Sequence, residues 1–146
     1  MNAVNRSMTV HYQSRLSGVH CPYFMRFGLT LALALMMVGG GIMHFVAPRA
    51  YARTVPSFLP GPLMLVWVSG VFEILGGAGL LIPSTRLWAA WGLILLFLAI
   101  FPANVNMAVK RIGFGKKSPP AWALWARLPF QAVFIAWAWW VGVRPS

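Results

Sequence analysis

Four long apolar stretches, separated by short segments rich in proline and glycine, make up most of this 146-residue chain. Each stretch holds roughly 20 residues, the length that an α-helix needs to cross a hydrocarbon core about 30 Å thick. The prolines and glycines between the stretches are expected to end the helices. The pattern therefore predicts an all-α membrane protein, a four-transmembrane-helix bundle with spans over residues 24–45, 63–82, 87–109 and 121–143.

The composition also favours a membrane protein. Sixty per cent of the residues are hydrophobic, 9% are charged, and the mean hydropathy is +0.73. A soluble domain of this size would have too little polar surface to stay dispersed. The net charge is +11, but the basic residues lie between the apolar stretches, where they hold loops at anionic headgroups. We therefore expect a multi-pass protein whose partner is the lipid bilayer, with no nucleic-acid binding.

Residues 23–146 are expected to form one transmembrane domain, and residues 1–22 a polar, basic N-terminal extension. The sequence Ala50-Tyr51-Ala52 resembles a signal-peptidase site, but the apolar stretch before it has full spanning length, so a retained helix is the better interpretation. An even number of helices puts both termini on one side. The basic residues close to helix ends favour the two opposite loops as the cytoplasmic side, by a small margin.

Sulfur and histidine chemistry is limited by the residues present. The single cysteine, Cys21, excludes an internal disulfide and a CxxC redox pair. His11 and His20 lack the spacing of metal ligands. No metal site is predicted, and no cofactor motif is evident.

Glu73 is the only acidic residue of the chain, and it lies in the middle of the second apolar stretch. A carboxyl group in hydrocarbon is costly, so it must face protein, a cation or a water pocket. Small residues lie three and four positions from it, and a second group of glycines precedes His44 in the first stretch. Such stripes let helices approach closely. We therefore expect Glu73 to point into the bundle, with helix contacts at Gly39, Gly40, Gly41, Gly70, Gly76 and Gly77.

Polar residues in the other stretches lie at similar depth. The first and third helices end, and the second and fourth begin, on the same side of the membrane. A rise of 1.5 Å per residue puts Glu73 and Gln131 about 15 Å, and Arg127 about 9 Å, below that surface. The sequence therefore predicts a buried polar cluster that is a candidate ligand-binding site, made of His44, Glu73, Asn104, Arg127 and Gln131.

Each of these residues also has a plainer interpretation. Arg127 is long enough to reach the headgroups instead of pairing with Glu73. A pair of Glu73 and Arg127 could lock the bundle without any chemistry. A histidine near a helix end, such as His44, is commonly interfacial, and Asn104 could satisfy backbone that Pro102 frees.

Five short motifs occur in order along the chain: GIMHF at residues 41–45, PSFLP at 56–60, SGVFEILGG at 69–77, FPAN at 101–104 and RLPFQ at 127–131. Their combination resembles the DoxX family of small bacterial membrane proteins over residues 27–143. The resemblance implies four transmembrane helices in the bacterial cytoplasmic membrane. It also implies a link to a thiosulfate:quinone oxidoreductase subunit, and so a quinone as a possible ligand. The loop at 110–117 is more basic than the family pattern.

Two functions from different classes remain. The chain could be an accessory or ligand-binding subunit, whose polar cluster binds a quinone or lipid or which docks a membrane redox partner or a second copy of itself. Alternatively, it could be a membrane-embedded enzyme, an oxidoreductase subunit linked to the quinone pool that uses Glu73 for proton transfer. No nucleophile with an adjacent base, no metal ligand set and no nucleotide loop supports the enzyme. We therefore favour the accessory or ligand-binding subunit.

Overall fold

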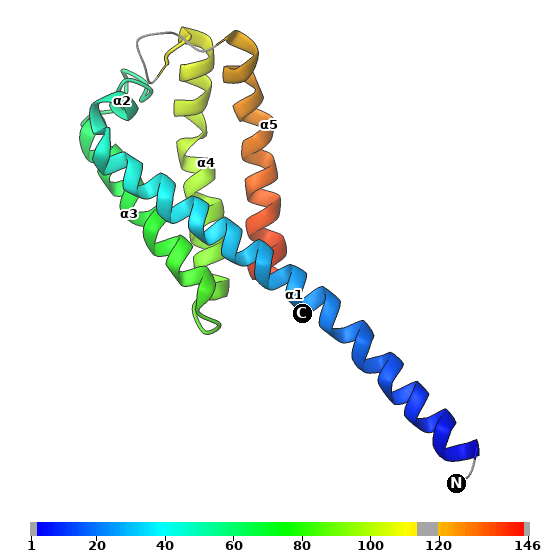
Figure 1. Ribbon diagram of the computed structural model, residues 1–146. Helices are drawn as coiled ribbons and strands as arrows, with labels where there is room; N and C mark the ends of the chain where they lie inside the picture. The colour runs from blue at the N-terminus through cyan, green and yellow to red at the C-terminus, as the bar shows by residue number, and fades with distance from the viewer. Residues whose placement is uncertain (1–2, 114–119, 145–146) are drawn as a thin grey trace.

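The protein is all-α in a computed structural model, which describes the backbone of residues 3–113 and 120–144 and the side chains from Phe24 onward within those ranges (Figure 1). The elements are α1 (Ala3–Val46), α2 (Pro48–Ala52), α3 (Pro62–Leu81), α4 (Arg86–Lys110), α5 (Ala121–Ala138) and the π-helical η1 (Trp139–Val143). Four of them are long, and η1 continues α5 without a break. The prediction of a four-helix membrane bundle is confirmed.

Among the residues that the structure describes, three helical segments are long and apolar enough to cross a membrane: Phe24–Val46, Pro62–Leu81 and Arg86–Lys110. The helix of α5 and η1 matches the fourth predicted stretch, but Arg127 and Gln131 make it less apolar. Large apolar side chains face outward on all four long helices, where Leu35, Leu75, Leu95 and Phe130 are each more than 60% exposed. A multi-pass protein turns such residues toward lipid.

The first helix is much longer than a membrane is thick. At 1.5 Å per residue, the 44 residues of α1 span about 66 Å. The backbone of the expected N-terminal extension, residues 1–22, is helical from Ala3 and continuous with the first span. Figure 1 shows this N-terminal part projecting away from the other helices.

The apolar core fills the half of the bundle next to the termini. There α1 crosses obliquely, contacting α3 and η1, while α4 packs between α3 and α5 with η1 (Figure 1). The core residues are Leu33, Met37, Leu80, Ala90, Leu93, Ile94, Phe97, Ala138 and Val141. In the half next to the long loops, Met107, Ala108 and Leu124 join α4 to α5. The buried polar side chains of Glu73 and Gln131 lie outside both of these apolar clusters.

Backbone conformation and arginine side chains cap several helix ends. Gly61 adopts φ of 62°, a left-handed conformation that favours glycine, and Pro62 then starts α3. Arg26 donates from Nη2 to the carbonyls of Val141, at 3.3 Å, and Arg144, at 2.5 Å. Arg86 donates from Nε to the carbonyl of Leu80, at 3.0 Å. These guanidinium groups satisfy carbonyls that the ends of η1 and α3 leave without helical donors.

Candidate functional site

The contact between α1 and α3 is close because glycines face each other across it. A Cβ added at Gly41 would lie 2.6 Å from the carbonyl oxygen of Gly70, and one at Gly70 would lie 2.8 Å from Cβ of His44. A Cβ at Gly77 would lie 2.8 Å from the carbonyl oxygen of Ala34. Backbone cannot move aside as a flexible side chain can, so a larger residue at these positions would separate the helices.

The other three glycines differ in what they face. Gly40 leaves room for a carboxyl group, since a Cβ there would lie 3.0 Å from Oε2 of Glu73. Gly76 faces α4, where a Cβ would lie 2.6 Å from Cδ2 of Leu93. Gly39 departs from the expected helix contact: it is exposed and a Cβ there would meet nothing within 4 Å. One residue is a rotation of about 100° around a helix, which takes Gly39 away from the face that Gly40 presents.

Glu73 lies in this α1–α3 contact and is 6% exposed. Its Oε2 is 3.6 Å from Nδ1 of His44, an ion-pair distance when the imidazole is protonated. His44 Nδ1 is also 2.9 Å from the carbonyl oxygen of Gly40. A carbonyl only accepts, so Nδ1 carries a hydrogen and the neutral ring keeps Nε2 as an acceptor. The backbone of α1 thus fixes the imidazole beside the carboxyl group.

Tyr51 of α2 completes this arrangement, although it is absent from the residues expected at the site. Its ring stacks on the imidazole of His44, with centroids 4.2 Å apart and an angle of 28° between the planes. Tyr51 follows His44 by seven residues, which is two helical turns, so i and i+7 spacing is the signal that could have found it. The chain bends between α1 and α2, at Ala47, and the two rings still meet.

The electrostatics of Tyr51 connect it to two other helices. Burial raises the pKa of its phenol, the negative charge of Glu73 raises the pKa further, and the positive charge of Arg127 lowers it. Arg127 belongs to α5, and its Nη1 lies 4.0 Å from the sulfur of Met107. His44 is the residue that lies at ion-pair distance from Glu73 in the structure. Direct pairing of Glu73 with Arg127 stays a prediction.

Asn104 and Gln131 form a separate pair between α4 and α5. Asn104 donates from Nδ2 to Oε1 of Gln131 at 2.9 Å, and Gln131 donates from Nε2 to the carbonyl of Phe97. Gln131 is 5% exposed. Asn104 and Gln131 thus bond to each other and to Phe97. Among the described side chains, neither of them bonds to His44 or Glu73. The Asn104–Gln131 pair therefore connects α4 to α5. It lies next to the turn of α4 in which Pro102 lacks a backbone hydrogen-bond donor.

The segment after α2 is held over the loop end of α4. Asn106 donates from Nδ2 to the carbonyl of Thr54 at 2.9 Å, and Arg53 donates from Nη2 to the carbonyl of Gly113 at 3.5 Å. These bonds keep α2, and therefore Tyr51, close to the ends of the spans. The site is consequently a cluster of His44, Tyr51 and Glu73, with Arg127 within electrostatic reach.

The cluster brings several polar groups together among apolar helix surfaces. It offers a carboxyl group, an imidazole, a phenol hydroxyl and two aromatic ring faces, and the outer surface of the helices is apolar. Small-molecule sites commonly consist of a few such polar groups within an apolar lining. The same carboxyl and imidazole could also exchange a proton.

One family model matches residues 31–142, which run from the second half of α1 into η1. The chain belongs to the family described as Domain of unknown function (DUF8561). All the candidate residues lie inside the matched range, and the match is to this family, not to DoxX. No curated protein and no solved structure matches the chain significantly.

Proposed function

We propose that this small multi-pass membrane protein is an accessory or ligand-binding subunit, and that the cluster of His44, Tyr51 and Glu73 holds the polar head of a quinone or lipid. The observation that carries the proposal is the position of Glu73. The only acidic side chain of the protein is buried in the α1–α3 contact, 3.6 Å from an imidazole that itself stacks on a phenol. A purely apolar contact between two glycine-rich helices would not need any of these groups.

The chemistry of the three side chains suits a quinone headgroup. Its ring could stack on an aromatic face, and its carbonyl oxygens need hydrogen-bond donors, which the Tyr51 hydroxyl and Nε2 of a protonated imidazole can supply. Its isoprenoid tail would lie along the exposed apolar side chains of the spans. The resemblance of the motifs to the DoxX family, with its quinone link and its place in the bacterial cytoplasmic membrane, points the same way.

A second function is supported by the distance between Glu73 and His44. A carboxyl and an imidazole 3.6 Å apart could exchange a proton once a small movement brings them within hydrogen-bond distance. On this alternative the protein is an oxidoreductase subunit linked to the quinone pool, and Glu73 delivers one of the two protons that a quinone takes up, together with two electrons, when it is reduced to a quinol. The membrane partner that supplies the electrons would be a separate redox protein.

Quantifying the molecules that co-purify with Glu73→Gln tests the proposed function. The carboxamide keeps the shape and removes the negative charge that pairs with a protonated His44, so we expect bound quinone or lipid per protein, measured by mass spectrometry, to fall about tenfold, as for loss of a hydrogen bond from a charged group. Thr30→Val is a matched control, because Thr30 is a buried polar residue of α1 that bonds the carbonyl of Arg26, away from the cluster. It should keep the bound molecule.

Two results would contradict binding at this site. Glu73→Gln could retain the same amount of quinone and lipid as the unchanged protein. Alternatively, it could lower the free energy of unfolding by roughly 3–5 kcal/mol, the cost of breaking a buried ion pair, which would make Glu73 a structural lock.

A further inference from the structure

An open hollow of about 910 Å³ lies at the corner where α1 turns into α2. Most of its wall is apolar and includes Phe45, Val46 and Pro48. Its two charged side chains, Arg49 and Arg53, are both exposed. The hollow therefore combines an apolar wall with two guanidinium groups and does not include the cluster of His44, Tyr51 and Glu73.

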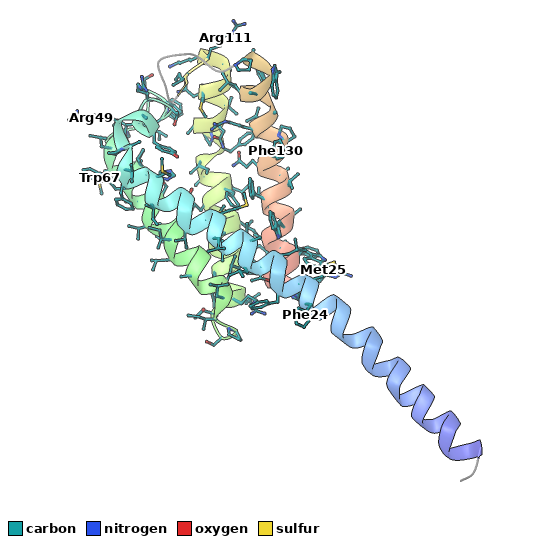
Figure 2. The ribbon with its side chains drawn as sticks, viewed as in Figure 1. Phe24, Met25, Arg49, Trp67, Arg111 and Phe130 are labelled. Carbon is teal, nitrogen blue, oxygen red and sulfur yellow. The ribbon has the colours of Figure 1, made fainter. Side chains whose placement is uncertain are left out.

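The position of the hollow corresponds to the boundary between acyl chains and headgroups. Val46 is the last residue of the first span, and Arg49 follows it by three residues. Phe45 is 45% and Val46 68% exposed, as expected of side chains that meet lipid. Figure 2 shows Arg49 projecting away from the bundle on the side that also carries Trp67 of α3, a residue type enriched at membrane interfaces.

The charge of this corner is not neutralised by the protein itself. The only acidic side chain, Glu73, is buried beside His44. Arg53 donates to the Gly113 carbonyl, which is a neutral acceptor, and a guanidinium has five N–H donors, so others remain for an anion. Guanidinium groups bind phosphate in a bidentate manner, and an anion from outside the chain can supply the missing counter-charge.

We propose that this hollow binds the headgroup of an anionic phospholipid, with its phosphate between Arg49 and Arg53 and its acyl chains along Phe45 and Val46. A free phosphate would use the guanidinium groups but leave the apolar wall exposed, whereas a phospholipid covers both. The proposal does not depend on the function of the Glu73 cluster, because the two sites share no residue.

The test is binding of defined lipids to the full chain, followed by native mass spectrometry in a neutral detergent. Phosphatidylglycerol should bind more tightly than phosphatidylcholine with the same acyl chains, by about fivefold for each arginine that contributes. The variant Arg49→Gln/Arg53→Gln should lose this preference. Lys110→Gln/Arg111→Gln is the matched control, since it removes two exposed charges from the same end of the bundle outside the hollow and should keep the preference. Melting temperatures in phosphatidylcholine establish that both variants fold.

Three results would overturn the proposal. The Arg49 and Arg53 variant could retain the full preference for phosphatidylglycerol, which would place the lipid elsewhere. Both variants could lose the preference equally, which would make it an effect of net charge. Inorganic phosphate at millimolar concentration could displace the lipid completely, which would make the hollow a site for free anions.

Discussion

Tyr51 interacts with residues of three other helices. It lies outside the spans, in α2, stacks on His44 of α1, and is influenced by Glu73 of α3 and Arg127 of α5. The burial of Glu73 could be predicted from the sequence, because a carboxyl group in an apolar stretch is too costly to face lipid. The role of Tyr51 could not be read from hydropathy, because a tyrosine beside a helix end is also an ordinary interfacial residue.

The ionisation of Tyr51 provides the first test at this scale. Its burial and the carboxylate of Glu73 raise its pKa above the ordinary value of 10.0. Tyrosinate absorbance should therefore show a component that titrates above the ordinary value of 10.0, and Tyr51→Phe should remove that component. Glu73→Gln should bring its midpoint closer to the ordinary value, because the neutral amide no longer opposes the phenolate. An unchanged midpoint in Glu73→Gln would place the carboxylate too far away to act on Tyr51.

The same pKa shift sets a pH dependence of stability. The folded protein holds the phenolic proton more tightly than the unfolded chain does, so the free energy of unfolding falls as the pH rises through the unfolded pKa toward the folded one. Below that window the group has no effect on stability. Tyr51→Phe should show less of this alkaline decrease than the unchanged protein.

At the scale of elements, the ends of α3 and α4 were predictable to within a residue, whereas the length of α1 and the exposure of Gly39 were not. α3 and α4 begin and end one residue from the boundaries that the apolar stretches indicate, because proline and basic residues mark where hydrocarbon ends. The extent of α1 to Ala3 could not be predicted, since residues 1–22 carry no apolar stretch. Gly39, Gly40 and Gly41 look alike in sequence, but only the partner helix decides which of them is covered.

Alanine substitutions in α1 distinguish the covered from the uncovered glycine. Gly41→Ala should lower the free energy of unfolding by about 1–3 kcal/mol, because its Cβ would meet the Gly70 backbone. Gly39→Ala should be neutral or stabilise by up to about 1 kcal/mol, because it gains helix propensity in open space. Unfolding in mixed detergent micelles measures both. Equal effects of the two substitutions would remove the argument for a glycine contact between α1 and α3.

At the scale of the whole molecule, the apolar core and the polar cluster occupy opposite halves of the bundle. The core joins α1, α3, α4, α5 and η1 near the termini, whereas the cluster lies where α1, α2 and α3 meet near the long loops. The common depth of the polar residues was predictable from helix direction alone. Their division into a Glu73 cluster and an Asn104–Gln131 pair was not, because it depends on which helices are neighbours.

The topology of the bundle can be tested with reporters fused to each terminus. Four membrane-crossing helices require both termini on one side, and the basic residues close to helix ends favour the two long loops as the cytoplasmic side. Alkaline phosphatase should therefore be active at both ends. Opposite signals from the two ends would mean that one of the four helices, with α5 the least apolar, does not cross the membrane.

The burial of the only side-chain carboxyl has a practical consequence for chemical labelling. A lipid-soluble carbodiimide added to intact membranes would find a single side-chain target in this protein. Its adduct would appear as one mass increment on the peptide that contains Glu73, and any molecule seated in the cluster would slow its formation. The native protein thus carries an occupancy reporter that needs no introduced cysteine and no fluorescent group.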